Sequence, residues 1–324
     1  MNGARRRLVQ AAGAAALAMP FLARSQKPPI KVLVGLPPGG GTDAIARVIT
    51  DRLALELGQP IVIDSRVGAG GRIAADVLLG AEPDGLTYMI APNATPVFQM
   101  LVFARQLRWD ALRDFAPVAQ LASYPLGMAV GLQTGASDVR GFVDWVRQNP
   151  KAASFGTPGL GGQNHFLGVA FAKQAGIDLP VTPYRGTPPM LNDLLGGHIP
   201  SAISLMDGMI AYHRAGKLRV IGLFTPKRSE LMPDIPTFAE QGVAVTSGEG
   251  WTGMWAPAHT PPAEIERVAQ ALKKVLAVPA TAELLKTRLA VVPDFADGAA
   301  MAARLRAELA YWAPIIQASG FKPE

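Results

Sequence analysis

Residues 30–57 read IKVLVGLPPGGGTDAIARVITDRLALEL: an apolar run, a glycine-rich loop and an amphipathic segment in direct succession. Ile30–Leu36 is short and apolar, so it predicts a buried β-strand. Thr42–Leu57 predicts a helix, because its apolar side chains recur every three or four residues and Gly58 and Pro60 end the pattern. The stretch therefore predicts a strand, a loop and a helix in that order.

Short apolar runs and helical patterns continue to alternate after this unit. The next expected elements are a strand, a helix and a strand, at Ile61–Ile63, Ile73–Leu79 and Tyr88–Ala91. The alternation restarts at Met128 and reaches Phe224, and the last part of the chain predicts three helices, Ala263–Leu276, Ala280–Leu289 and Gly298–Ala318. This order predicts an α/β protein with mostly parallel sheets flanked by helices.

Two sheets fit the number of expected strands better than one long sheet, with the C-terminal helices returning to pack on the first sheet. We expect residues 26–120 and 250–324 to form lobe 1, and residues 121–249 to form lobe 2. The chain then crosses between lobes in Pro117–Tyr124 and again within Val243–Ala256, and two crossings make a hinge. The expected molecule is a two-lobed monomer.

The N-terminus has the order of a secretory signal peptide. Arg5-Arg6-Arg7 precede an apolar, alanine-rich run, Leu8–Ala23, that is short for a membrane span and is interrupted by Pro20. Small residues at Ala23 and Ser25 predict cleavage after Ser25, and hence a periplasmic protein. The arginines also suggest the twin-arginine export route. An attached N-terminal helix is the alternative.

Composition excludes several classes of function. With 49% hydrophobic and 17% charged residues, the chain has a globular composition. Without the four arginines of residues 1–25 it has 27 basic and 25 acidic residues, which argues against nucleic-acid binding. The absence of cysteine excludes thiol catalysis, and the four histidines lack metal-ligand spacing. We expect no catalytic residue, no cofactor and no metal.

The loop between the first strand and the first helix is suited to hold an anion. Consecutive glycines expose backbone N–H groups, and a helix N-terminus adds partial positive charge. Thr42 is a natural N-cap, and Asp43 complements the helix dipole. The structural alternative is a tight turn with a good cap. The ligand-binding candidates in this loop are Pro38, Gly39, Gly40, Gly41, Thr42 and Asp43.

The same loop partly matches a dinucleotide-binding turn, Gly39-x-Gly41-x-x-Ala44, with Asp64 at the distance of a ribose-binding acid. Two observations weigh against a dinucleotide-binding enzyme. Pro37-Pro38 separates the glycines from the strand, where a dinucleotide turn is tight, and an exported protein rarely meets that cofactor.

Three further glycine loops follow expected strands, at Gly68–Gly71, Phe155–His165 and Pro183–Pro188. The loops therefore lie at carboxyl ends of strands, where open α/β sheets bind ligands, and both halves of the chain contribute. A cleft lined from both lobes follows. Structural roles remain open for His165, Arg185 and Asp207, and we expect Trp251 and Trp255 in the core or hinge. The remaining candidates are Gly70, Gly71, Asn93, Thr157, Gly159, Gly161, Gln163, Asn164, His165, Tyr184, Arg185, Gly186 and Asp207.

These loops occur in one order together with five further motifs: Pro83–Thr87, Asp114–Val118, Asp193–Gly197, Pro233–Thr237 and Gly250–Pro257. Together they resemble the substrate-binding proteins of tripartite tricarboxylate transporters, the Bug family, over nearly the whole chain after the leader. The resemblance implies a periplasmic Venus-flytrap receptor, type II-like, that binds a small carboxylate and delivers it to a large and a small membrane subunit. A receptor that signals to a sensor is the alternative.

The resemblance also implies how the ligand is held, through loop amides and waters of Pro38–Asp43, Thr157–His165 and Tyr184–Gly186. The chain departs from the family pattern in three places. Leu36 replaces a usual aromatic residue, Ser65-Arg66-Val67 replaces Asn-x-Pro, and Gly162 stands where serine is frequent. Because these positions shape the pocket, the identity of the ligand does not follow from the family.

Overall fold

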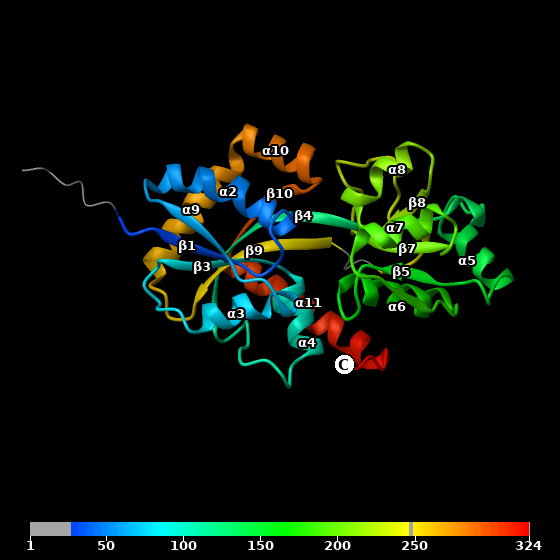
Figure 1. Cartoon of the computed structure of the whole chain (residues 1–324), viewed down its shortest axis with the longest axis horizontal. Coiled ribbons are helices and arrows are strands. Elements are labelled where there is room, and N and C mark those ends of the chain that lie inside the picture. The colour runs from blue at the N-terminus through cyan, green and yellow to red at the C-terminus, as the bar shows by residue number, and fades with distance from the viewer. Residues whose placement is uncertain (1–26, 246–248, 324) are drawn as a thin grey trace, which may run out of the picture.

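The computed structural model describes residues 27–245 and 249–323, so the expected signal peptide, residues 1–25, lies outside the described residues. Figure 1 shows two lobes side by side along the long axis, with one long strand that runs from the first lobe into the second. The strands are β1 (Ile30–Val34), β2 (Ile61–Ser65), β3 (Thr87–Pro92), β4 (Phe115–Val130), β5 (Phe155–Thr157), β6 (Val181–Pro183), β7 (Ser201–Leu205), β8 (Arg219–Leu223), β9 (Glu249–Pro257) and β10 (Val292–Asp297).

Helices cover both lobes. The α-helices are α2 (Gly41–Leu57), α3 (Arg72–Leu79), α4 (Met100–Val102), α5 (Val139–Gln148), α6 (Gln163–Ala175), α7 (Thr187–Leu195), α8 (Ile210–Arg214), α9 (Pro262–Ala277), α10 (Pro279–Leu289) and α11 (Gly298–Ala318). Short helical turns are η1 (Ala69–Gly71), the π-helical η2 (Ala94–Gln99), η3 (Leu132–Thr134), η4 (Met206–Gly208) and η5 (Ala239–Gln241).

The sheet of the first lobe has the strand order β2-β1-β3-β9-β4, and β10 pairs with β4. β1 pairs in parallel with β2 and β3, as the alternation of strands and helices predicts. β9, β4 and β10 pair antiparallel with their neighbours. The expectation of mostly parallel pairing thus holds for the βαβ part, whereas β4 and β9, where the chain passes between the lobes, pair antiparallel.

The sheet of the second lobe has the order β4-β7-β5-β6, and β8 also pairs with β4. β5 pairs in parallel with β6 and β7. β7 and β8 are antiparallel to β4. This sheet is therefore mixed in the same way as the first, with a parallel part joined to a crossing strand.

The two crossings between the lobes are strands paired with each other. Pro117–Tyr124, expected as a link, lies within the 16-residue strand β4, and β9 pairs with β4 from Phe115–Pro257 to Pro125–Glu249. β4 is buried over nearly its whole length, so its sequence reads as a continuous apolar run without a visible break. The hinge is consequently a two-stranded ribbon in place of two independent linkers.

Strand directions place the loops of both lobes at the same junction. β4 runs from the first lobe into the second, and β1 and β3 run in its direction because β9 is antiparallel to both β3 and β4. β7 is antiparallel to β4, and β5 and β6 run in the same direction as β7. The carboxyl ends of the parallel strands in the two lobes therefore face each other.

Apolar cores form on both faces of the first sheet and hold these strands in place. On one face α2 contributes Ile45, Ile49 and Leu53, each at most 2% exposed, which pack with side chains of α9 and α10. Each fully buried side chain of this kind stabilises the fold by about 1.5–3 kcal/mol. The rigid position of α2 fixes its N-terminus at the end of β1.

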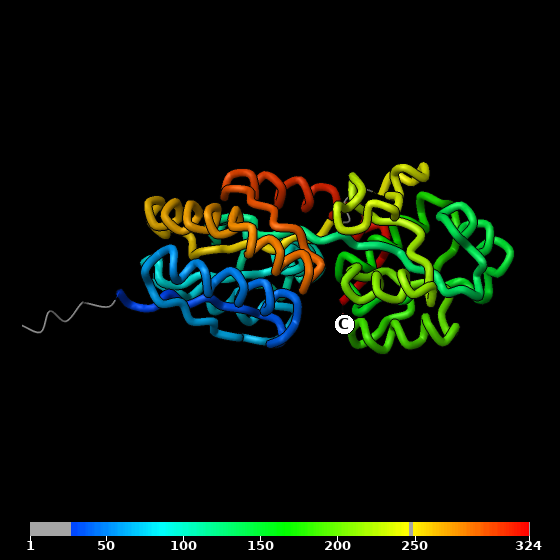
Figure 2. The backbone as a smooth tube through the Cα atoms, turned by 90° about the horizontal axis from the view of Figure 1, so that it is seen from above, coloured from blue at the N-terminus to red at the C-terminus, as the bar shows by residue number. Residues whose placement is uncertain are grey.

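The lobes also touch outside the hinge. The rings of Phe98 in η2 and Phe166 in α6 stack 6.1 Å apart at 9°, and Phe166 meets Phe321 beyond α11 edge to face. Figures 1 and 2 both show the end of α11 reaching the second lobe, where it contacts α6. Lys286 of α10 pairs with Glu230 of the second lobe at 2.8 Å.

Candidate functional site

The loop after β1 presents backbone N–H groups at the start of α2. The N–H of Gly40 donates to Pro37 O at 3.1 Å and that of Gly39 donates to a carboxylate oxygen of Asp43 at 2.9 Å. Within the described parts of the chain, no acceptor is recorded for the N–H groups of Gly41 and Thr42. Two neighbouring donors at the positive end of a 17-residue helix are suited to an anion.

The Asp43 carboxylate stabilises the loop, and its charge is paired within the protein. Its side chain is 2% exposed and accepts from the Gly39 N–H and from Arg47, whose Nε lies 2.8 Å away. The hydrogen bond from Arg47, opposed by burial and aided by the Gly39 N–H, keeps the pKa of Asp43 below its usual range. A ligand anion therefore meets a carboxylate that is already neutralised by its partners.

The second glycine loop packs tightly against neighbouring backbone. Gly70 and Gly71 have φ values of 65° and 95°, and a Cβ on Gly71 would lie 2.6 Å from Thr95 Oγ1. A Cβ on Gly35, at the end of the β1 segment, would lie 2.6 Å from the Cα of Gly71. Gly70 and Gly71 thus bring this loop against the first one and against η2.

The third glycine loop leads from β5 into α6. Thr157 is fully buried and its hydroxyl donates to Gly159 O at 3.0 Å, which folds the loop back on the strand. α6 begins at Gln163, and no acceptor is recorded within the described residues for the N–H groups of Asn164 and His165. The buried side-chain oxygen Oδ1 of Asn164 also has no recorded partner. The start of α6 thus resembles the start of α2 in its free donors.

His165 has a structural role in this loop. It is 4% exposed, and its Nδ1 accepts from the Gly161 N–H at 3.3 Å. Burial lowers the pKa of His165, so the ring is neutral with its proton on Nε2. A Cβ on Gly161 would approach the ring of Phe321 to 3.1 Å and Val102 of α4 to 3.5 Å, so this loop touches the first lobe.

Asn93 and Gln163 join the two lobes directly. Asn93 follows β3, is 1% exposed, and its Nδ2 donates to Gln163 Oε1 at 3.2 Å. The same nitrogen donates to Glu308 Oε2 of α11, also at 3.2 Å. Trp251 of β9 donates its indole N–H to Glu308 at 2.7 Å, and its backbone carbonyl accepts a hydrogen bond from the Asn93 N–H at 2.8 Å. These contacts lie where the carboxyl ends of the two sheets face each other.

The loop after β6 contributes one exposed cation. Tyr184 donates its hydroxyl to Asp193 Oδ2 at 2.7 Å, and burial together with this hydrogen bond raises the pKa of Tyr184 to about 12. Gly186 has φ 97° and donates its N–H to Pro158 O at 3.2 Å, which ties this loop to the third one. Arg185 between them is exposed, and no ion pair or hydrogen bond of its side chain is recorded among the described residues.

Asp207 follows β7 in η4, and its Oδ1 accepts the Gly208 N–H at 2.7 Å. Its side chain is exposed in the present arrangement, yet the surrounding protein atoms desolvate it and raise its pKa. Asp207 therefore belongs to the junction between the lobes and is open to solvent there.

The structure brings some sequence candidates together and leaves others apart. Asn93 meets Gln163, and the loops of Thr157 and Gly186 bond to each other. No hydrogen bond or ion pair joins Pro38–Asp43 to the second lobe within residues 27–245 and 249–323. Among those residues, no group of three His, Asp or Glu side chains can hold a metal ion, and no helix is long and apolar enough to cross a membrane.

Sequence reasoning missed the polar cluster behind Asn93. Glu308 is only 7% exposed and also accepts from Arg304 Nε at 3.0 Å. Arg304 in turn donates to Gln120 of β4 at 3.1 Å and to Glu249 O of β9 at 3.2 Å. The only sequence signal was an arginine and a glutamate four residues apart in a long helix, a spacing that is common on exposed faces.

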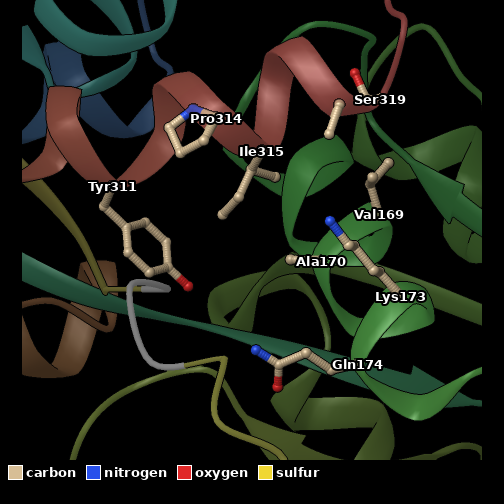
Figure 3. Close-up of a pocket in the computed structure, with 9 residues that line it drawn as sticks. Val169, Ala170, Lys173, Gln174, Tyr311, Pro314, Ile315 and Ser319 are labelled. Carbon is tan, nitrogen blue, oxygen red and sulfur yellow. The ribbon is translucent and has the colours of Figure 1, made fainter.

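A separate cavity of about 470 Å³ lies between α6 and α11, and Figure 3 shows its lining. The lining side chains come from one helix of each lobe and include none of the candidates named from the sequence. They are Val169, Ala170, Lys173, Gln174, Tyr311, Pro314, Ile315, Ala318 and Ser319.

Comparison with known proteins identifies a consistent group of relatives. The model of the tripartite tricarboxylate transporter family receptor matches residues 45–321. Protein BugT of Bordetella pertussis (strain Tohama I) is 30% identical, over 91% of this chain and 90% of its own length. R. palustris Rpa4515, solved with adipate, superposes with a TM-score of 0.79 at 28% identity, over 91% of this chain and 98% of that one. MatC from Rhodopseudomonas palustris, solved with malate, has a TM-score of 0.73 at 26% identity, over 89% and 98%.

Proposed function

Because this chain belongs to the tripartite tricarboxylate transporter receptor family, we propose that it is a periplasmic solute-binding protein that holds a small organic carboxylate between its lobes. One observation carries the proposal. The helices α2 and α6 both begin at the carboxyl end of a parallel strand, with N–H groups that have no recorded acceptor in the described residues, and these ends face each other.

Backbone donors of this kind supply enough free energy to hold a carboxylate. Each charge-assisted hydrogen bond contributes about 1.5–3 kcal/mol, and a helix N-terminus adds about 0.3–2 kcal/mol depending on burial. A micromolar complex needs about 8 kcal/mol net, so a few such bonds suffice. The donors that support the proposal are the N–H groups of Gly41 and Thr42 in one lobe and of Asn164 and His165 in the other.

Calorimetry with dicarboxylates tests the proposal. The purified protein is unfolded and refolded to remove any copurified small molecule, which mass spectrometry then identifies. Adipate and malate serve as probes, because structurally similar proteins were solved with them. The neutral diamide of adipic acid is the matched control, and it should bind far more weakly because it lacks the charge. Stabilisation by NAD or NADP with no binding of any carboxylate would favour the dinucleotide-binding enzyme.

We further propose that the loaded receptor is a monomer that delivers its ligand to membrane subunits after export and removal of residues 1–25. Vesicles that contain the membrane subunits should take up the ligand only when the receptor is added. Ligand binding without any dependence of uptake on the receptor would favour the sensor alternative. Intact mass of the exported protein should correspond to a chain that begins at Gln26.

A further inference from the structure

The cavity between α6 and α11 combines an apolar lining with one cation. Its volume of about 470 Å³ lies in the range of pockets that hold small organic molecules. Lys173 is the charged residue of the lining, and among the described residues no acidic side chain lines the cavity. The apolar side chains come from both helices and are Val169, Ala170, Pro314, Ile315 and Ala318. This composition is complementary to a ligand with an apolar body and a negative charge.

Two polar groups of the lining are free to meet a ligand. The Gln174 amide and the Ser319 hydroxyl already donate to backbone carbonyls, at 3.3 and 2.6 Å. No hydrogen bond or ion pair of the Lys173 amine or the Tyr311 hydroxyl is recorded within the parts of the chain that the structure describes. In Figure 3 the Lys173 amine extends from α6 toward Ile315 of α11. Burial raises the pKa of Tyr311, so its hydroxyl keeps its proton and can donate.

Buried aromatic side chains hold the two walls of the cavity in place. Phe166 and Phe171 fix α6, and Trp312 fixes α11 by packing against Phe98 with ring centroids 5.2 Å apart. The two helices also contact each other directly. Because α6 belongs to the second lobe and α11 is continuous with the first, a molecule in the cavity contacts both lobes. A ligand bound here therefore stabilises this arrangement of the lobes.

A structural role for Lys173 must be separated from a binding role. Lys173 lies in the last turn of α6, where a cation interacts favourably with the helix dipole. That interaction affects the stability of the helix and needs no cavity. A role in binding instead affects the affinity for an anion, so the two roles have different measurable effects.

We propose that this cavity is a second binding site, separate from the cleft, for an apolar monocarboxylate. Lys173 pairs with the carboxylate, and the apolar side chains of α6 and α11 cover the hydrocarbon part. The site uses none of the N–H groups at the starts of α2 and α6, so the inference goes beyond the proposed function and does not depend on it.

Calorimetric titration with octanoate, below its micellar concentration, is the first test. One molecule should bind per chain. Hexanoate should bind about tenfold more weakly, because each buried methylene group favours binding about fourfold. 1-Octanol has the same chain length without the charge, and it should bind at least about threefold more weakly because it cannot form the ion pair. Equal affinity for octanol and octanoate, or no saturable binding of octanoate, would refute the proposal.

Ala318→Glu tests the wall that α11 contributes. Ala318 is exposed and lines the cavity, so the introduced carboxylate either repels octanoate or pairs with Lys173 in its place. Both effects should raise Kd for octanoate at least about fivefold. Ala313→Glu is the matched control, because Ala313 is exposed on the same helix but does not line the cavity. An equal change in Kd for the two variants contradicts the proposed site.

Lys173→Gln tests the cation on α6. Its Kd for octanoate should rise at least about threefold, whereas its Kd for octanol should stay within about twofold of the wild-type value. Lys151→Gln removes an exposed lysine of the same lobe outside the cavity and should leave both values unchanged. A loss of thermal stability in Lys173→Gln with an unchanged Kd for octanoate would show that the lysine serves only the helix.

A competition experiment separates this cavity from the cleft. The Kd for octanoate should change by less than about twofold when adipate or malate is present at saturation, as expected for distant sites. A Kd that rises in proportion to the dicarboxylate concentration would place octanoate in the cleft and overturn the proposal. Failure of the wild-type protein to bind any dicarboxylate, with octanoate binding that Ala318→Glu weakens, would overturn the proposed function alone.

Discussion

A single backbone N–H can be removed at Gly41 without disturbing the fold. Gly41 is the first residue of α2, its N–H has no recorded acceptor in the described residues, and a Cβ added there meets nothing within 4 Å. The preceding residue, Gly40, is extended at φ −75° and ψ 168°, a conformation that proline accepts before it. Proline is favoured at the first position of a helix, so Gly41→Pro should fold normally.

Gly41→Ala is the control that keeps the N–H. Both substitutions restrict the unfolded chain and should stabilise the protein slightly, by about 0.4–1 kcal/mol. If the N–H holds a carboxylate, Gly41→Pro loses one charge-assisted hydrogen bond of about 1.5–3 kcal/mol, and its Kd should exceed that of Gly41→Ala by about 10- to 150-fold. The assay is calorimetric titration with the carboxylate that binds the wild-type protein, together with thermal unfolding. Equal Kd values for the two folded variants would refute the account of an anion held by α2.

Three further substitutions test the loops. Asp43→Asn should lower Tm by a few degrees at pH 7. Arg47 holds the pKa of Asp43 below the unfolded value of 3.8, so the ionised carboxylate stabilises the folded state above about pH 4. This stabilisation is lost as the pH falls through the folded pKa. Thermal unfolding from about pH 3 to 7 should therefore show the Tm values of the variant and the wild type converging at acid pH. Arg185→Gln should change the free energy of unfolding by less than about 0.5 kcal/mol and raise Kd less than tenfold, and complete loss of binding in calorimetry would instead indicate a side-chain salt bridge to the ligand. Gly35→Ala should destabilise by about 1–3 kcal/mol in chemical denaturation, because its Cβ would lie 2.6 Å from the Cα of Gly71 and backbone cannot yield; unchanged stability would contradict the close approach of the two loops.

The elements with strong periodicity were predicted well from the sequence. The expected helix Gly298–Ala318 coincides with α11, and the expected helices Ala263–Leu276 and Ala280–Leu289 match α9 and α10 to within one residue at each end. The two-lobed α/β fold is confirmed by the family match and by structures that align over most of the chain. The glycine loops could be predicted from the sequence because each of them interrupts the apolar pattern after an expected strand.

The crossing ribbon and the polar cluster behind Asn93 could not be predicted from the sequence. β4 has bulges in its pairing with β9 and is buried on both faces, so it shows neither alternation nor a break where the lobes meet. Glu308 lies in a helix 215 residues after Asn93, and only tertiary packing brings them together. α6 begins at Gln163, so the last residues of the expected loop Phe155–His165, among them Asn164, lie in the first turn of the helix.

The proposed recognition through backbone donors would allow this chain to depart from the family pattern and still bind a carboxylate. Replacing a side chain, as at Leu36 or Gly162, leaves every backbone N–H in place, so the attraction for an anion is kept. What changes is the volume and polarity next to the anion: a Cβ on Gly162 would meet no atom within 4 Å, so its absence leaves space where a serine would place a hydroxyl. In the proposed site, the start of the helices therefore selects a negatively charged ligand, and the variable side chains around them select its length and shape.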